Sequence, residues 1–173
     1  MISRSLFVEE KKLRVFDFDD TLVRTDSYVY VTHKSGSKTK LTPGEFAVYK
    51  PKKYDVFDFS DFHYVKNPQE IKAITEVLRR MLKAAGDRKV YILTARSAAK
   101  PITKYLRDIG VRGVEVIALG DGNPEKKADW IEARVKEDGY DHVFFIDDSE
   151  PNVKAVRKRM QRLGVAHRVR HMK

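Results

Sequence analysis

Acidic residues stand at the ends of two short apolar runs that lie far apart in the chain. Residues 13–18 (LRVFDF) lead into the segment DFDDT at 17–21, and residues 142–146 (HVFFI) lead into Asp-Asp at 147–148. Packing alone gives no reason to gather carboxylates at strand ends, because unpaired acids repel one another. A divalent cation removes this repulsion, and Mg²⁺ prefers hard oxygen ligands together with waters and substrate phosphates. The two acidic segments therefore predict a Mg²⁺ site.

The residue types around these acids suit chemistry at phosphorus. A carboxylate at Asp17 can attack a phosphorus atom and form an aspartyl-phosphate. Asp19 lies two residues further on and points to the same side of an extended strand, where it can protonate the leaving group and later activate water. Thr94 can hydrogen-bond a phosphoryl oxygen, and Lys127 can neutralise charge on the transferring group. The predicted reaction is the hydrolysis of a phosphomonoester.

A parallel sheet would bring these distant residues together. Apolar runs typical of buried strands alternate with amphipathic helical patterns, which predicts βαβ units with helices on both faces of the sheet. Ligands bind such sheets beyond the carboxyl ends of the strands. We expect residues 1–173 to form a single doubly wound α/β domain. The expected strands are residues 13–18, 89–93, 114–119, 142–146 and 165–169, and the expected helices are residues 68–85, 101–109, 124–138 and 151–163.

The first of these helices has a start signal in the sequence. Asn67 offers an N-cap, Pro68 stands at the first helical position and Glu70 at the third. Gly86 is expected to end this helix.

Residues 26–66, between the first strand and this helix, are expected to form a flap or small lid. Residues 28–32 (YVYVT) and 41–51 (LTPGEFAVYKP) flank a turn that contains Gly and Ser. This alternation of aromatic and β-branched residues around a turn predicts a hairpin. The insertion is too short for a globular cap, so we expect the site at the strand ends to be open.

Part of this insertion nearly repeats the first acidic segment. Residues 56–63 read VFDFSDFH, whereas residues 15–22 read VFDFDDTL. The second copy lacks the acid/base carboxylate, because Ser60 stands in the place of Asp19. Three of its aromatic residues are expected to anchor the flap to the rest of the protein: Phe57, Phe59 and Phe62. In the alternative interpretation, two of its acids border the substrate: Asp58 and Asp61.

Four motifs follow one another at the predicted strand ends and helix starts. They are DFDDT at 17–21, LTAR at 93–96, a lysine at 126–127 and Asp-Asp at 147–148. In type and order this set strongly resembles the haloacid dehalogenase (HAD) superfamily of phosphohydrolases, over essentially the whole chain outside the flap. The resemblance implies a Rossmann-like core and a Mg²⁺-dependent phosphatase that works through an aspartyl-phosphate.

The resemblance also implies a role for each matching residue. Asp17 is the expected nucleophile and Asp19 the expected general acid/base. The implied Mg²⁺ ligands are Asp17, the backbone carbonyl of Asp19, Asp147 and Asp148, with Asn152 in support. The expected substrate-binding residues are Thr21, Arg96 and Lys126. Lys127 is preferred over Lys126 as the catalytic lysine because the residues that follow it read as one helical face.

A response-regulator receiver domain is the nearest alternative by residue type. Such a domain also places paired acids, a hydroxyl group and a lysine on a parallel sheet. There, however, the acid pair follows the first strand and the phosphorylated aspartate follows the third. The order here, with DxD first and Asp-Asp last, favours the hydrolase.

The distribution of charge bears on the substrate. The formal net charge is +10, and residues 151–173 contain eight Lys or Arg residues but no Asp or Glu. Such a segment can bind phosphate-rich partners, or it can be the solvated face of a helix. An open site, moreover, admits the end of a polymer better than it encloses a small metabolite.

The chain is also similar in part to the phosphatase half of polynucleotide kinase-phosphatases. The shared features are DxDxT, an arginine two residues beyond the hydroxyl of the second motif, Asp-Asp, and a closing basic helix that ends in RLGV. Three interpretations follow: a phosphatase that acts on nucleic-acid 3′ ends, one that acts on a nucleotide or other small phosphoester, and a non-catalytic nucleic-acid-binding module.

Composition limits the setting in which the protein works. The chain has no cysteine, which excludes disulfides and thiolate metal sites and suits a reducing compartment. Residues 1–14 lack the apolar core of a signal peptide, and no apolar run approaches the roughly 18 residues of a membrane span. We therefore expect a cytoplasmic protein. The sequence does not indicate an oligomeric state.

Overall fold

A five-stranded parallel sheet forms the centre of the protein. The structure, a computed structural model, describes residues 9–173. The strands of the sheet are β1 (Lys12–Phe16), β7 (Arg88–Thr94), β8 (Glu115–Ala118), β9 (His142–Asp147) and β10 (Ala166–His171). Their order across the sheet is β10-β9-β1-β7-β8, so the strand order reverses between β1 and β9. This reversal confirms the doubly wound α/β architecture predicted from the sequence.

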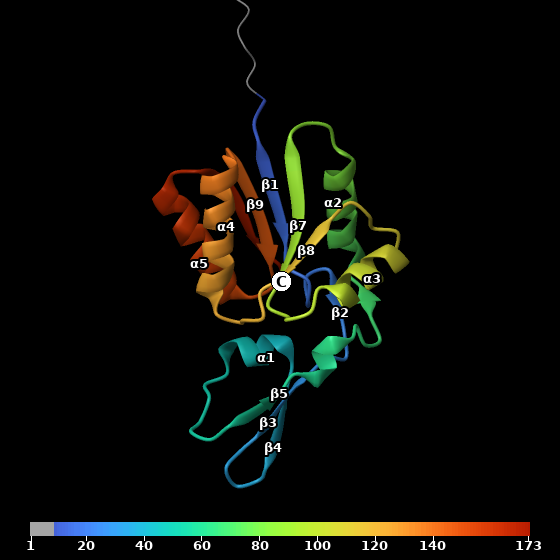
Figure 1. Cartoon of the computed structure of the whole chain (residues 1–173), viewed down its shortest axis with the longest axis vertical. Coiled ribbons are helices and arrows are strands. Elements are labelled where there is room, and N and C mark those ends of the chain that lie inside the picture. The colour runs from blue at the N-terminus through green and yellow to red at the C-terminus, as the bar shows by residue number, and fades with distance from the viewer. Residues whose placement is uncertain (1–8) are drawn as a thin grey trace, which may run out of the picture.

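Helices cover both faces of this sheet because successive side chains of each strand point to opposite faces. The helices are α2 (Lys72–Lys83), α3 (Lys100–Asp108), α4 (Pro124–Asp138) and α5 (Glu150–Leu163). Phe16 and its neighbours pack with α2 and α3, whereas Val15 and its neighbours pack with α4 and α5. Figure 1 shows the two helix pairs on opposite sides of the sheet. We call the sheet and these four helices the body.

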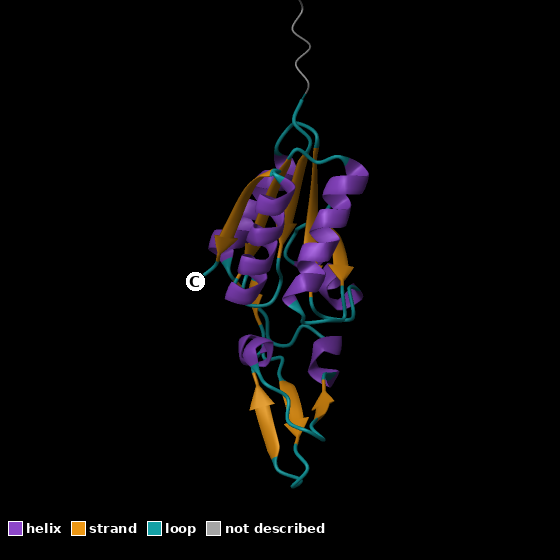
Figure 2. Ribbon diagram, turned by 90° about the vertical axis from the view of Figure 1, so that its left-hand side faces the viewer, coloured by secondary structure: helices purple, strands orange, loops and turns teal. Residues whose placement is uncertain are grey.

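The insertion after β1 begins and ends in a short antiparallel pair, β2 (Val23–Arg24) with β6 (Gln69–Glu70). Between them lies the flap, residues 26–66, which stands beyond the carboxyl ends of the parallel strands (Figures 1 and 2). Its elements are β3 (Val29–Thr32), β4 (Lys38–Leu41), α1 (Pro43–Val48), β5 (Val56–Asp58) and the 3-10 helix η1 (Ser60–His63). Val29, Val31 and Leu41 form a separate small core with aromatic residues of the flap.

The flap confirms the predicted hairpin and adds a helix that the sequence pattern did not predict. Strand β3 pairs with β4 across a turn in which Gly36 has a φ of +83°. The next residues were expected to stay extended, but they form α1. A capping box explains the difference: Thr42 accepts a hydrogen bond from the backbone of Glu45, and the Glu45 side chain accepts one from the backbone of Thr42.

The predicted start of the helix at Asn67 is wrong. The helix α2 begins at Lys72, and Asn67 has a left-handed φ of +44°. The two residues expected in its first turn, Gln69 and Glu70, instead pair with β2 as the chain returns from the flap. The helix ends at Lys83, shortly before Gly86. The capping signal at Asn67 therefore does not start a helix, because the next residues form the strand pair of β6 with β2.

The prediction that the chain lacks a signal peptide rests partly on residues 1–8, which lie outside the described residues. Within residues 9–173, no helix combines the length and the apolar character that crossing a membrane requires.

Candidate active site

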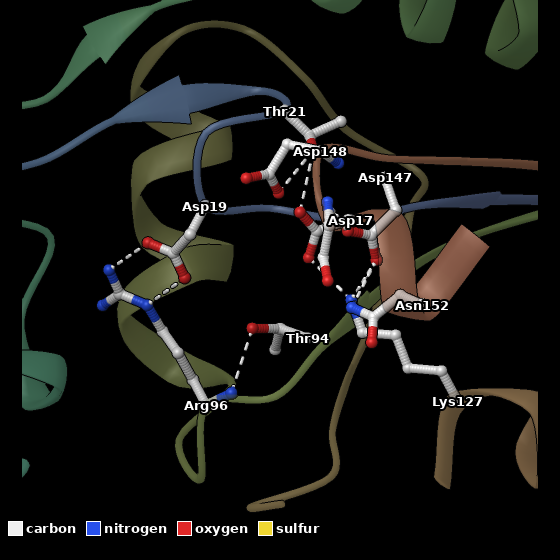
Figure 3. Close-up of polar contacts among 10 residues, drawn as sticks. Asp17, Asp19, Thr21, Thr94, Arg96, Lys127, Asp147, Asp148 and Asn152 are labelled. Atoms are coloured by element: carbon white, nitrogen blue, oxygen red, sulfur yellow. Dashed lines mark hydrogen bonds and ion pairs between the residues drawn. The ribbon is translucent and has the colours of Figure 1, made fainter. Parts of the chain in front are cut away.

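Three carboxylates meet where the strand order of the sheet reverses. Phe16 of β1 is aligned with Ile146 of β9, and the backbone N–H of Asp17 donates to the Ile146 carbonyl over 3.0 Å. Asp17 therefore follows β1 directly beside Asp147, the last residue of β9. One carboxylate oxygen from each of Asp17, Asp147 and Asp148 lies within 4.8 Å of the others. Figure 3 shows the three side chains converging from these two strands.

Lys127 reaches this cluster from the first turn of α4. Its Nζ lies 2.7 Å from Asp17 Oδ1 and 2.7 Å from Asp147 Oδ2, and the side chain is almost fully buried. Burial works to lower the pKa of Lys127, but the charges of Asp147 and Asp17 outweigh it and raise the pKa, so the ammonium stays charged. Lys126, the alternative candidate, is exposed and lies outside the cluster.

One ammonium group does not balance three carboxylates. Burial, followed by the charge of Asp147, raises the pKa of Asp17 well above its usual value. The same two causes raise the pKa of Asp148 to about 6. A divalent cation would relieve this excess of negative charge, and the donor set consists only of oxygen atoms, which suits Mg²⁺. The residues present therefore fit the predicted ion.

Polar side chains around the cluster hold its members in place. Thr21 is fully buried, donates a hydrogen bond of 2.8 Å to Asp17 Oδ2 and accepts one from the backbone of Asp148. Asn152 donates a hydrogen bond of 2.9 Å to Asp147, in the supporting position that was expected. Thr21 thus lies behind the carboxylates, whereas the sequence predicted that it contacts the substrate.

Ser149 is a residue of the site that the sequence analysis missed. It is the N-cap of α5, and its Oγ is buried without a hydrogen-bond partner in the part of the chain that the structure describes. Buried polar atoms without a partner are rare in folded proteins, and Ser149 lines the same pocket as the three acids. Its position directly after Asp147-Asp148 was the available sequence signal.

A pocket of about 400 Å³ opens between this cluster and the flap. Thr94 lines its body side, is buried, and accepts a hydrogen bond of 3.1 Å from the backbone of Arg96. The flap forms the opposite wall. The body contributes Asp17, Asp19, Thr94, Ser97, Lys127, Asp147, Asp148, Ser149 and Asn152, among others, and the flap contributes Val29, Pro43, Gly44, Phe46, Ala47, Phe59 and Phe62. The flap therefore covers one side of the site, and the pocket stays partly open to solvent.

Asp19 lines the same pocket as Asp17, but its carboxylate is turned toward Arg96 (Figure 3). Arg96 Nε lies 2.8 Å from Asp19 Oδ2, and Arg96 Nη2 lies 2.7 Å from Asp19 Oδ1. The turn that follows contains Asp20 with a left-handed φ of +60°, and it ends the extended path of β1. Asp19 and Arg96 thus form a bidentate ion pair at the edge of the pocket.

The same guanidinium also binds the flap. Arg96 Nη1 donates to the carbonyl groups of Tyr64 (2.8 Å) and Phe62 (3.4 Å), and Nη2 lies near the hydroxyl groups of Thr25 and Ser27. The Arg96 side chain is only 2% exposed. Because all of its N–H groups have partners, Arg96 connects Asp19 to the flap, and no donor is left for the substrate contact that was expected.

The near copy at residues 56–63 has no catalytic arrangement. Asp58 accepts a hydrogen bond of 2.8 Å from the backbone of Ser60, and Asp61 is held inside the flap. Neither side chain lines the pocket. Of the aromatic residues expected to anchor the flap, Phe57 and Phe62 pack against the flap core, and Phe59 and Phe62 line the pocket.

The basic segment at residues 151–173 is partly used to hold the body together. Arg159 lies within 2.6–2.7 Å of three acids of α4: Glu125, Asp129 and Glu132. Lys154 pairs with Glu150 on the same helix. No Lys or Arg of this segment lines the pocket.

We compared the chain with protein-family models, with curated proteins and with solved structures, and none of the three comparisons found a match. The α/β fold with its parallel sheet and its buried aspartate cluster is therefore established by the structure alone.

Proposed function

We propose that the protein is a Mg²⁺-dependent phosphomonoester hydrolase that works through an aspartyl-phosphate. The observation that carries the proposal is the buried cluster of Asp17, Asp147 and Asp148 with Lys127, in a pocket at the point where the strand order reverses. Ligand sites of open α/β sheets lie at such points. The resemblance of the four motifs to the HAD superfamily supports the same chemistry.

Asp17 is the proposed nucleophile because it lies at the centre of the cluster and lines the pocket. Its carboxylate oxygen forms a bond to phosphorus while the bond from phosphorus to the leaving oxygen breaks. Asp19, on the same pocket wall, is the proposed acid that gives a proton to the leaving oxygen, a step in which its carboxyl group turns from Arg96 toward the pocket. In the second step Asp19 takes a proton from water, whose oxygen attacks phosphorus, releases inorganic phosphate and restores Asp17.

The remaining residues orient the reactants and balance charge. Lys127 and Thr94 face the pocket, where they are proposed to contact phosphoryl oxygens. Asp17, Asp147 and Asp148, with the backbone carbonyl of Asp19, would hold Mg²⁺. When bound, the ion supplies positive charge to the carboxylates and to the phosphoryl group. Arg96 is proposed to act through Asp19 as a positioning residue.

A small phosphoester is the favoured substrate class, with a nucleic-acid 3′ end as the second candidate. The flap covers one side of the pocket, which gives a small molecule apolar contacts that an uncovered sheet edge would lack. The partial resemblance to polynucleotide kinase-phosphatases and the basic segment at residues 151–173 support the second candidate.

Release of inorganic phosphate from a panel of phosphoesters tests the proposal. The panel contains p-nitrophenyl phosphate, nucleoside monophosphates and a 3′-phosphorylated oligonucleotide, each with Mg²⁺ or with EDTA. We expect turnover with Mg²⁺ and a rate about 10³-fold lower with EDTA. Salt-sensitive oligonucleotide binding without turnover of any member would instead support a non-catalytic binding module.

A further inference from the structure

An aromatic wall faces the carboxylates across the pocket. Phe46 of α1, Phe59 and Phe62 of the flap line it, and the rings of Phe46 and Phe59 lie 5.3 Å apart with an edge-to-face tilt. Phe59 remains 44% exposed, whereas Phe16 and Phe18 of the body are fully buried. A large apolar side chain that stays partly exposed inside a ligand pocket marks a contact surface for a ligand.

The charges of the pocket restrict what this ligand can carry. Apart from the metal-site cluster, the lining contains two more acids, Asp19 and Asp121. Its cations, as far as residues 9–173 show, are Lys127 and Arg96. Lys127 pairs with the cluster and Arg96 has no free N–H group. One phosphate next to a bound cation is accommodated, but a second phosphate would face acids without a partner.

We infer that the substrate is a phosphomonoester whose leaving group carries a planar, uncharged aromatic ring system that packs against Phe59 and Phe46. The inference rests on the proposed phosphatase function and names its substrate class. A pocket of about 400 Å³ has the size for one phosphate and one nucleoside-sized group. Planar rings stack on aromatic side chains, whereas an aliphatic alcohol of the same charge lacks this contact.

A nucleoside, an aryl group and the terminal nucleotide of a polymer all provide such a ring. Within residues 9–173, the lining has no free cation for a second phosphate, which disfavours the polymer, and the pocket volume of about 400 Å³ favours a nucleoside over a smaller aryl group. In a polymer, the next phosphate follows the terminal sugar directly, and it would enter the acidic part of the pocket or its rim.

The central experiment compares kcat/KM for a nucleoside 3′-monophosphate and for glycerol phosphate. Phe59→Ala is expected to lower the ratio of the two values roughly tenfold, the loss of one stacking contact. Phe59→Leu, which is apolar but not planar, is expected to lie between Phe59→Ala and the wild type. Tyr64→Ala is the matched control, because Tyr64 is an exposed flap aromatic (67%) outside the pocket lining. An unchanged ratio in Phe59→Ala overturns the inference.

Three further substrates show whether the aromatic ring belongs to a free nucleoside, to an aryl group or to the terminal nucleotide of a polymer. The same nucleoside as a 3′,5′-bisphosphate and the same nucleotide at the end of an oligonucleotide are expected to react at least tenfold more slowly than the monophosphate. Phenyl phosphate is expected to lie between the monophosphate and glycerol phosphate. If the oligonucleotide is the best substrate, the leaving group is not the uncharged one that we infer.

A binding measurement separates failure of this inference from failure of the proposed function. Calorimetry with Asp17→Asn, which cannot form the covalent intermediate, reports nucleoside monophosphate binding without turnover. Weaker binding in the double variant Asp17→Asn/Phe59→Ala supports the aromatic wall even if no phosphoester is hydrolysed. Equal binding in both proteins contradicts it, whatever the activity of the wild type.

Discussion

Two segments of nearly the same sequence, residues 15–22 and 56–63, place their acids in opposite surroundings. In the first, Asp17 lies buried beside two other carboxylates, and burial together with the charge of Asp147 raises its pKa. In the second, Asp61 is also buried, but its oxygens accept hydrogen bonds from Tyr28 N, the Tyr30 hydroxyl and Lys66 Nζ. Burial alone would raise the pKa of Asp61, yet these donors lower it.

The difference separates acids that serve binding from acids that serve the fold. A buried carboxylate surrounded by donors is stabilised in the folded state, and removing it costs stability. A buried carboxylate surrounded by acids is destabilised until a ligand or a cation supplies the missing charge. The sequence VFDF occurs in both copies, so the neighbours brought by the fold decide which kind of acid results.

The largest expected effect comes from replacing an aspartate with asparagine at the equivalent position of each copy. Asp17→Asn removes the proposed nucleophile and is expected to lower kcat about 10⁴-fold or more while leaving the protein folded. Asp58→Asn is the matched control and is expected to retain activity within about twofold, because Asp58 only accepts a hydrogen bond from the Ser60 backbone. Steady-state kinetics and circular dichroism measure both. Activity that persists in Asp17→Asn would falsify the assignment of the nucleophile.

Removal of the metal is the next largest effect. EDTA is expected to lower the rate about 10³-fold, and added Mg²⁺ to restore it. Binding to the folded state at roughly a hundredfold excess over Kd should also raise the Tm of the wild type by about 5–10 °C. Asp147→Asn should abolish most of this shift, because Asp147 belongs to the cluster. Asp61→Asn, in the flap, should keep the shift. The same Mg²⁺ response in Asp147→Asn would place the ion elsewhere.

Arg96 joins the two regions, since it binds Asp19 of the first copy and the Phe62 carbonyl of the second. Arg96→Lys keeps the charge but not the bidentate geometry, and we expect about a 10²-fold loss of kcat from misplacement of Asp19. The loss should be larger for an alkyl leaving group, which needs a proton, than for p-nitrophenol, which does not. Arg107→Lys, at an exposed position of α3, should change neither rate. Equal losses with both leaving groups would mean that Arg96 has only a structural role.

The body could be predicted from the sequence because its signals are periodic. All five strands and four helices of the body were predicted, although one helix starts four residues late. The meeting of Asp17, Asp147 and Lys127 follows from the same topology, because the carboxyl ends of adjacent parallel strands share one edge of the sheet.

The connection between the site and the flap could not be predicted in this way. Arg96 and Asp19 are 77 positions apart, and nothing in either segment indicates that they pair. The burial of Thr21 beside Asp17 could not be predicted, because side-chain direction after a strand end depends on the turn, here on the left-handed Asp20. Residues 43–48 form a helix because of a capping box that the surrounding β-like pattern concealed.

Asp61→Asn tests whether a buried acid surrounded by hydrogen-bond donors stabilises the flap. It weakens hydrogen bonds to a charged group, and we expect the flap to lose about 2 kcal/mol of stability. Hydrogen exchange should then become faster at backbone amides near Tyr28 and Phe62, while those of β1 and β9 keep their protection. Asp58→Asn, whose carboxylate bonds only locally, should show a smaller change. Faster exchange throughout the body instead would show that the flap and the body unfold as one unit.

The smallest expected effect is a pH dependence confined to the flap. Burial works to raise the pKa of Asp55, but hydrogen bonds from the Lys52 backbone, His33 and Tyr49 outweigh it and lower the pKa from 3.8 to about 2. Because the pKa is lower in the folded state, this stabilisation is complete above about pH 4 and is lost as the pH falls toward 2.

The measurement is thermal unfolding of the wild type and Asp55→Asn between pH 7 and pH 2.5. The Tm difference between them should stay constant down to about pH 4 and then shrink, because a protonated Asp55 resembles asparagine. Asp108→Asn, which breaks an exposed pair with Lys104, should show almost no difference at any pH. A Tm difference for Asp55→Asn that persists unchanged at pH 2.5 would mean that the charge of Asp55 does not stabilise the flap. Asp55 would then contribute through hydrogen-bond geometry alone, and the contrast with the acids of the cluster would lie in packing and not in charge.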